Sequence, residues 1–132
     1  MTAGNATEVA EVTQDGPFST KQRLRLDRAL RTADASTGLT FSIYVGPLGT
    51  PSREAAQELH AKIANSANAV LIAVSPQQRQ LEIVTGGQAR KRIHDRDAKL
   101  AALSMVAAFG GGDLTGGLLI GLDQLIGHAG RS

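Results

Sequence analysis

The stretch Ala69–Gly87, which reads AVLIAVSPQQRQLEIVTGG, decides the fold of this chain. The unbroken apolar run Val70–Val74 predicts a strand whose two faces are both covered, as in a parallel sheet flanked by helices. Only Pro76–Arg79 separates this strand from the next strand-like segment, Gln80–Thr85, and such a turn is too short for a crossover helix. The second strand must therefore return antiparallel, which makes the sheet mixed.

A cationic helix is predicted near the start of the chain. Ser19 and Gln22 have the spacing of a capping box, so the helix should begin near Ser19 and end at Gly38. Lysine and arginine spread over most of its surface, and one side follows the spacing of a buried helical face. This expected inward stripe comprises Leu26, Ala29, Leu30 and Ala33.

The next segments supply a parallel neighbour for the central strand. Residues 39–45 alternate apolar and polar side chains, the pattern of a strand with unequal faces. A helix capped by Thr50 and starting at Pro51 should follow, ending in the turn residues Asn65–Asn68. Because a strand, a helix and a strand come in this order, we expect strands 39–45 and 69–75 to be parallel.

Two further helices close the chain. His94 or Asp95 should open the first, which runs through Phe109, and Asp113 should cap the second, which runs to His128. The expected inward stripe of the first helix is Leu100, Leu103 and Ala107, with Val106 beside it. Glycine inside a helix costs about 1 kcal/mol relative to alanine, so the glycines of the second helix need close packing against a neighbour. These glycines are Gly116, Gly117 and Gly121.

Length and composition indicate a single domain, and nothing in them is typical of an exported protein. The 132 residues suit a single domain over 17–128, with 1–16 as a flexible segment or edge strand and 129–132 as a tail. Cysteine is absent, which excludes disulfides, thiolate nucleophiles and cysteine-ligated metals. No secretory signal begins the sequence, and the apolar segment 114–126 is too short for a bilayer. We therefore expect a cytoplasmic protein, monomeric or weakly dimeric.

No complete catalytic motif stands in the sequence. The histidines lack zinc-binding spacing, and the glycine-rich segment 110–117 lacks the ending of a phosphate-binding loop. Asp95 and Asp97 are interpreted as capping and dipole residues of the helix start, with His94 among the charges there. Basic residues gather in the early helix and again at Arg90, Lys91, Arg92 and Arg96, so the chain could bind nucleic acid if these surfaces adjoin.

Several short motifs resemble the TPM domain, a family named for a thylakoid acid phosphatase, a photosystem II repair protein and a modulator of acetylcholine receptors. The resemblance covers about residues 17–128. It also extends to a TPM-like domain of unknown function found in actinobacteria. The motifs are Phe18-Ser-Thr-Lys21, Val70–Val74, Leu81–Gly87, Ile93-His-Asp95 and Phe109–Asp113, followed by Gly116, Gly117 and Gly121–Leu125.

The resemblance implies a three-layer α/β/α sandwich with a mixed, mostly four-stranded sheet. Some members of that family bind a divalent metal and have weak acid phosphatase activity, so the resemblance also implies these two properties as expectations for this chain. Carried over by position, Asp95 and Asp113 are the candidate ligands for Ca²⁺ or Mg²⁺, and Gly86, Gly87 and His94 are the loop residues of that site. The glycine exit lacks the family's tyrosine, and a basic segment follows it.

These observations leave three hypotheses. The first is a non-catalytic module that binds a protein partner or a ligand. The second is a metal-dependent phosphomonoesterase in which Asp95 helps to hold the metal ion. The third is a nucleic-acid binder that uses the basic helices, although no aromatic platform is available to stack bases.

Overall fold

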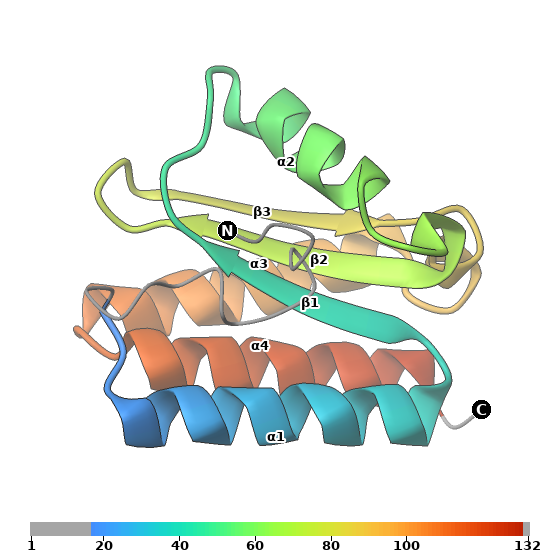
Figure 1. Ribbon diagram of the computed structural model, residues 1–132, viewed down its shortest axis with the longest axis horizontal. Coiled ribbons are helices and arrows are strands. Elements are labelled where there is room, and N and C mark those ends of the chain that lie inside the picture. The colour runs from blue at the N-terminus through green and yellow to red at the C-terminus, as the bar shows by residue number, and fades with distance from the viewer. Residues whose placement is uncertain (1–16, 131–132) are drawn as a thin grey trace.

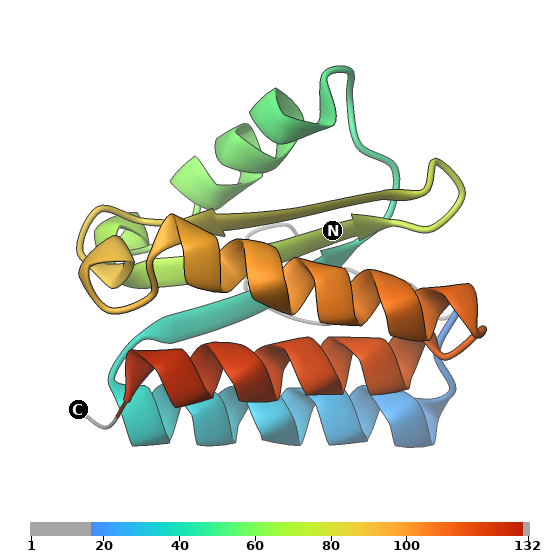
Figure 2. The same cartoon turned by 180° about the vertical axis from the view of Figure 1, so that it is seen from behind.

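A computed structural model describes residues 17–130, and its helices lie on both faces of a central sheet (Figure 1). Helix α2 covers one face, while α1, α4 and α3 lie side by side across the other (Figures 1 and 2). The prediction of a three-layer α/β/α sandwich is therefore confirmed. The elements are α1 (Thr20–Thr37), β1 (Thr40–Val45), α2 (Ser52–Ala61), η3 (Ser66–Asn68), β2 (Ala69–Ser75), β3 (Gln80–Thr85), η4 (Ala89–Lys91), α3 (Asp95–Gly110) and α4 (Leu114–Ala129), where η marks a 3₁₀ turn.

The sheet has the order β1-β2-β3 and is mixed, as the sequence predicted. β1 pairs parallel with β2, with Phe41 opposite Val70, and β2 pairs antiparallel with β3, with Ile72 opposite Ile83. Residues 17–130 contribute three strands, so the expectation of a mostly four-stranded sheet is wrong for this part of the chain. The edge strand proposed within residues 1–16 lies outside the described residues.

β2 is buried along its whole length, because helices cover both faces of the sheet. Val70 and Ile72 pack toward α1, α3 and α4, while Leu71 and Ala73 pack toward Ala56 of α2. The prediction that Val70–Val74 is apolar because both faces of the strand are covered is therefore confirmed. Within residues 17–130, no helix has the length and apolar character that a membrane crossing requires.

The ends of α1 follow the predicted signals. Ser19 Oγ accepts a hydrogen bond from the Gln22 backbone N–H at 3.1 Å, and Gln22 Oε1 accepts one from the Ser19 N–H at 2.9 Å. Gly38 ends the helix at a φ of 81°, a left-handed conformation that glycine adopts without strain. Of the expected stripe, Leu26, Leu30 and Ala33 are buried and Ala29 is partly buried.

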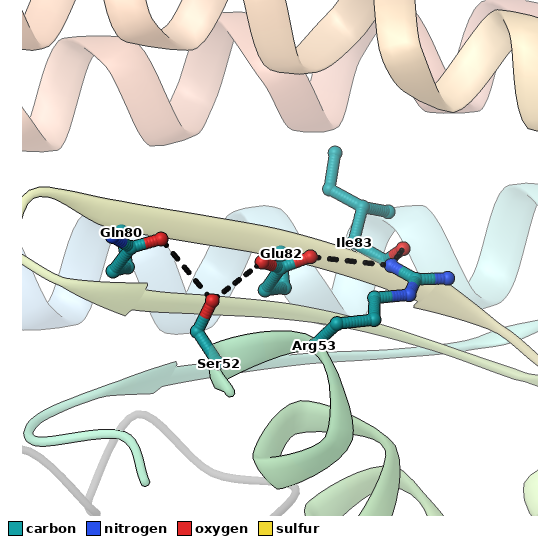
Figure 3. Close-up of polar contacts among 5 residues, drawn as sticks. All are labelled: Ser52, Arg53, Gln80, Glu82 and Ile83. Atoms are coloured by element: carbon teal, nitrogen blue, oxygen red, sulfur yellow. Dashed lines mark hydrogen bonds and ion pairs between the residues drawn. The ribbon is translucent and has the colours of Figure 1, made fainter. Parts of the chain in front are cut away.

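The predicted start of α2 is wrong by one residue. Pro51 is the N-cap, Thr50 lies outside the helix, and Pro51 makes no side-chain cap bond. Side chains of the first turn instead fasten the helix to β3 (Figure 3). Ser52 Oγ donates to Glu82 Oε2 at 2.7 Å, and Arg53 Nη1 donates to the backbone oxygen of Ile83 at 2.7 Å.

The predicted inward stripe of α3 is also wrong. The buried residues are Ala98, Ala101 and Met105, which face α4 and the sheet. Leu100, Leu103 and Val106 are instead 50%, 63% and 53% exposed. The inner face is made of two alanines and Met105, and the glycines of α4 leave room for Met105 and Phe109, the large side chains that α3 directs toward them.

Gly117 and Gly121 have the packing role that the sequence predicted, whereas the prediction is wrong for Gly116, where a Cβ would instead meet the side chain of the cap residue Asp113. A Cβ on Gly117 would lie 2.5 Å from Phe109 Cε1, and a Cβ on Gly121 would lie 2.2 Å from Met105 Sδ. Such approaches are closer than van der Waals contact, so α3 and α4 can meet at this distance only with glycine at these positions.

We expect Gly121→Ala to be less stable than Gly127→Ala by about 1–3 kcal/mol, the usual cost of overpacking. Both changes gain the helix propensity of alanine, but a Cβ on Gly127 would meet nothing within 4 Å. Urea unfolding of the two variants measures the difference. Equal stabilities would contradict the tight α3–α4 contact.

Asp34 joins the end of α1 to β1. Its Oδ1 accepts a hydrogen bond from the Phe41 backbone N–H at 2.8 Å. Burial raises the pKa of this carboxyl above its ordinary value of 3.8, although the bond from Phe41 opposes part of the rise. The folded state therefore holds the Asp34 proton more tightly than the unfolded state does.

This raised pKa predicts the sign of a pH effect. The contribution of Asp34 to stability is fully present below its unfolded pKa and is lost as pH rises through the folded value. Asp34→Asn keeps an oxygen acceptor for the Phe41 N–H but does not titrate. Urea unfolding between about pH 3 and about pH 7 should therefore show the stability difference moving in favour of the variant as pH rises. A shift in favour of wild type over this range would contradict the prediction.

Candidate functional site

A groove of about 710 Å³ lies between the β2–β3 turn and the outer side of α3. Its volume falls within the range of small-molecule and peptide-anchoring pockets. It begins at Ser75, the carboxyl end of β2, which is where open α/β sheets usually bind ligands. In Figure 2, α3 starts close to β3, and the two elements separate toward the β2–β3 turn.

The wall of the groove is apolar. Val74 and Leu81 contribute from the hairpin, and Leu103, Val106 and Phe109 contribute from α3. Leu103 and Val106 are two of the side chains that α3 leaves exposed, and Leu100 lies one turn before them. The exposed side of α3 therefore continues the groove as an apolar stripe, which we call the α3 stripe (Leu100, Leu103 and Val106).

Two cations, Arg79 and Lys99, flank this apolar wall. No carboxylate lines the groove, and neither cation has a hydrogen-bond or ion-pair partner for its side chain within residues 17–130. Arg79 also has a φ of 57°, a left-handed conformation that costs a non-glycine residue about 1 kcal/mol. The hairpin thus holds a cation at a position where glycine would be less strained.

The groove lining offers no acid–base or nucleophilic pair. Ser75 contributes the one hydroxyl, and it donates to Gln78 Oε1 at 2.6 Å. Gln78 is held in turn by the Leu48 backbone, with the Leu48 N–H donating at 2.8 Å and the Gln78 amide donating at 3.0 Å. These bonds hold the β2–β3 turn against the β1–α2 loop.

The two predicted carboxylates do not share a site. Asp95 is the first residue of α3, and Asp113 follows its end. A helix of 16 residues is about 24 Å long, which places the two side chains at opposite ends of α3. Asp113 caps α4 by accepting from the Gly116 N–H at 2.8 Å, while Asp95 is exposed with Arg90 Nε 3.9 Å away. No group of His, Asp and Glu able to hold a metal ion occurs within the described residues.

The predicted loop residues lie at the opposite end of the sheet from the groove. Gly86 is buried against η3, where a Cβ would lie 2.0 Å from the Ser66 oxygen, and Gly87 is exposed with nothing within 4 Å of its Cβ position. His94 is the N-cap of α3, and its backbone N–H donates to Asp97 Oδ2 at 3.1 Å. Capping by Asp97 replaces the predicted capping by Asp95.

The predicted basic patch divides into structural and exposed members. Arg92 donates to backbone oxygens of Thr37, Ala129 and Gly130, and Arg90 Nη2 donates to the Thr85 oxygen at 2.7 Å. Lys91 and Arg96 are exposed. Helix α4 lies between α3 and the basic helix α1 (Figure 2), while Arg92 reaches the end of α1 through its bond to Thr37.

Sequence reasoning missed the groove because it placed the α3 stripe inside. One signal was available, since Gly117 and Gly121 of α4 leave space for large side chains of a neighbouring helix, and Met105 and Phe109 of α3 fill that space. Arg79 gave no signal, because an isolated cation on a turn is usually solvated, and Lys99 was predicted only as the last member of the basic series that begins at Arg90.

The fold defines the class of this protein as an α/β/α domain with a three-stranded mixed sheet (Figure 1). The particular family follows from the sequence. The chain belongs to the family described as a domain of unknown function, DUF5130, whose sequence model matches residues 3–125.

Relatives of similar sequence occur in Mycobacterium tuberculosis. The uncharacterized protein Rv2468c of strain H37Rv is 36% identical over 113 residues, which cover 86% of this chain and 68% of the relative. The uncharacterized protein MT2543 of strain CDC 1551 gives the same values. These relatives support the family assignment.

Solved structures share the fold. The N-terminal domain of a protein from P. gingivalis has a TM-score of 0.78 at 19% identity, over 94% of this chain and 83% of that one. The BA42 protein of Bizionia argentinensis has a TM-score of 0.78 at 14% identity, with 89% and 84% covered. The N-terminal domain of cg2496 from Corynebacterium glutamicum has a TM-score of 0.71 at 20% identity, with 89% and 78% covered. At these identities the likeness concerns the fold alone.

Proposed function

We propose that this domain is a non-catalytic, TPM-like binding module whose groove takes an apolar, acidic segment of a partner protein. The observation that carries the proposal is the pairing of the exposed α3 stripe with Arg79 and Lys99, two cations without a carboxylate beside them. An apolar wall favours burial of aliphatic or aromatic side chains, and the cations favour negative charge at its edge.

The chemistry of the lining favours this function over a phosphatase. Phosphate-ester hydrolysis needs an activated nucleophile or a metal-bound water. The groove instead offers apolar side chains and a serine already bonded to Gln78. A nucleic-acid ligand fits less well, because Arg90 and Arg92 already bond backbone oxygens and, of the described residues, Phe109 is the one aromatic side chain that lines the groove.

The proposal is tested by selecting phage-displayed random linear peptides on the full chain. Peptides selected by wild type should be enriched in Asp and Glu together with Leu, Ile, Val and Phe. The double variant Arg79→Gly/Lys99→Gln should bind them about tenfold more weakly, since two partly exposed ion pairs contribute about 1.4 kcal/mol together. Arg79→Gly also relieves the left-handed strain, so a loss of stability cannot explain a loss of binding.

A matched control changes the same net charge elsewhere. Lys91→Gln/Arg96→Gln removes two exposed cations outside the groove lining and should leave binding unchanged. Leu103→Gln alters the apolar wall at an exposed position and should weaken binding without unfolding the domain. The proposal is wrong if selection yields no peptides, or if the selected peptides bind the groove variants and the control variant equally well.

A further inference from the structure

The outer edge of β3 has no neighbouring strand within residues 17–130, since the sheet order ends at β3. The Gly86 N–H donates to the Ala69 oxygen at 2.9 Å, which sets the alternation along the strand. The backbone N–H and C=O groups of the even-numbered residues of β3 bond to β2. Those of Leu81, Ile83 and Thr85 point away from β2, toward the outer edge. Such an edge can accept another strand through its N–H and C=O groups.

Two arginines cover part of this edge. Arg53 Nη1 donates to the Ile83 oxygen at 2.7 Å, and Arg90 Nη2 donates to the Thr85 oxygen at 2.7 Å. Figure 3 shows the Arg53 guanidinium reaching the Ile83 carbonyl from α2. The half of the edge toward η4 is thus occupied by side-chain donors. Leu81 differs, because no group of the described residues bonds its outward N–H or C=O.

The uncovered part of the edge coincides with the groove. Leu81 lines the groove together with Arg79 and Gln80, and Lys99 and Leu103 line it from α3. A strand added about 4.8 Å from β3 would direct alternate side chains toward the α3 stripe. Its backbone would form hydrogen bonds with the outward N–H and C=O groups of Leu81. Its acidic side chains would lie near Arg79 and Lys99.

We infer that the partner segment binds in extended form, as an additional β-strand paired with β3 at Leu81. This inference rests on the proposed function and specifies its binding mode. The occupant is an acidic segment of another protein, because the groove presents Arg79 and Lys99 and, among residues 17–130, no carboxylate. A second copy of this chain is disfavoured, since edge pairing about a two-fold axis would bring these cations against their own counterparts.

The test uses a synthetic peptide of alternating Val and Glu, about eight residues long, titrated into the ¹⁵N-labelled full chain. Two isomers carry N-methyl groups, one on every Val and the other on every Glu. In a strand, alternate N–H groups point to opposite edges, so only one isomer loses its bonds to β3. We expect the parent peptide to shift the amide signals of Leu81 and Lys99, and one isomer to bind at least about tenfold more weakly than the other.

The other outcomes separate the two proposals. If both isomers bind like the parent, or both lose binding, strand addition is wrong while a groove that binds peptides still stands. If the parent peptide does not bind, strand addition at Leu81 is overturned, and the phage selection decides the fate of the proposed function. A dimer in sedimentation equilibrium whose formation protects the Leu81 amide would overturn the choice of partner in favour of a second copy.

Discussion

Gly86→Ala is expected to lower the free energy of unfolding by about 3 kcal/mol or more. An added Cβ would lie 2.0 Å from the Ser66 oxygen and 2.5 Å from the Ala67 oxygen. Both atoms belong to the backbone of η3, which cannot turn aside as a flexible side chain can. The chain must shift at η3 or at the end of β3 to admit the methyl group.

Such a shift would disturb the hydrogen bonds that close this corner. The Gly86 N–H donates to the Ala69 oxygen at 2.9 Å, and the Gln88 N–H donates to the Ala67 oxygen at 2.8 Å. Each bond contributes about 1 kcal/mol, in addition to the overpacking cost. The loss should therefore exceed that of an ordinary overpacked position.

Gly87→Ala is the matched control, because it makes the same chemical change one residue later. Gly87 is exposed, its Cβ position is open, and its φ lies outside the left-handed region. Alanine there should change stability by less than about 0.5 kcal/mol or raise it slightly through the unfolded state. Urea unfolding of both variants gives the comparison. Similar losses of unfolding free energy in the two variants would contradict the close contact between η3 and Gly86.

This corner shows what a sequence pattern can and cannot identify. The pair Gly86–Gly87 was correctly predicted as the exit from β3. The pattern could not distinguish a glycine needed for a ligand from one needed for η3, because η3 lies about twenty residues earlier in the chain. Gly86 and Ser66 come close together only in the folded chain, so the sequence pattern does not reveal their contact.

The sheet was largely predictable for a physical reason. Val70–Val74 is apolar on both faces, and the short turn Pro76–Arg79 leaves no room for a crossover. These local features restrict the pairing of β2 to a parallel and an antiparallel neighbour, as observed. The starts of α1 and α4 were predictable for a similar reason, since Ser19 and Asp113 bond to backbone groups within one helical turn.

The candidate site was much less predictable, because it depends on the rotation of α3 about its axis. This helix carries two faces of helical spacing, one of leucines and valine and one of alanines with Met105. Hydrophobicity favours burying the first, but the second is the face that meets α4, where Gly121 receives the side chain of Met105. Packing geometry outweighed side-chain hydrophobicity, and the displaced leucines became the wall of the groove.

Replacing Arg92 by Met is expected to lower the free energy of unfolding by about 2–4 kcal/mol, through the loss of charge-assisted hydrogen bonds. Its Nη1 donates to the Thr37 oxygen at 2.6 Å, its Nε to the Ala129 oxygen at 3.1 Å, and its Nη2 to the Gly130 oxygen at 3.0 Å. Thr37 and Ala129 are the last residues of α1 and α4. One guanidinium thus satisfies terminal carbonyls of two helices and opposes the negative ends of both helix dipoles.

The control is Lys91→Met, which removes an exposed cation from the neighbouring position and should change stability by less than about 0.5 kcal/mol. Arg92→Lys should be intermediate, because an ammonium is a point charge that cannot span the acceptors as the planar guanidinium does. Amide hydrogen exchange adds a local readout, since the last turns of α1 and α4 should exchange faster in Arg92→Met before global unfolding. Equal stability of Arg92→Met and Lys91→Met would instead assign Arg92 to the solvated basic surface that its sequence context suggested.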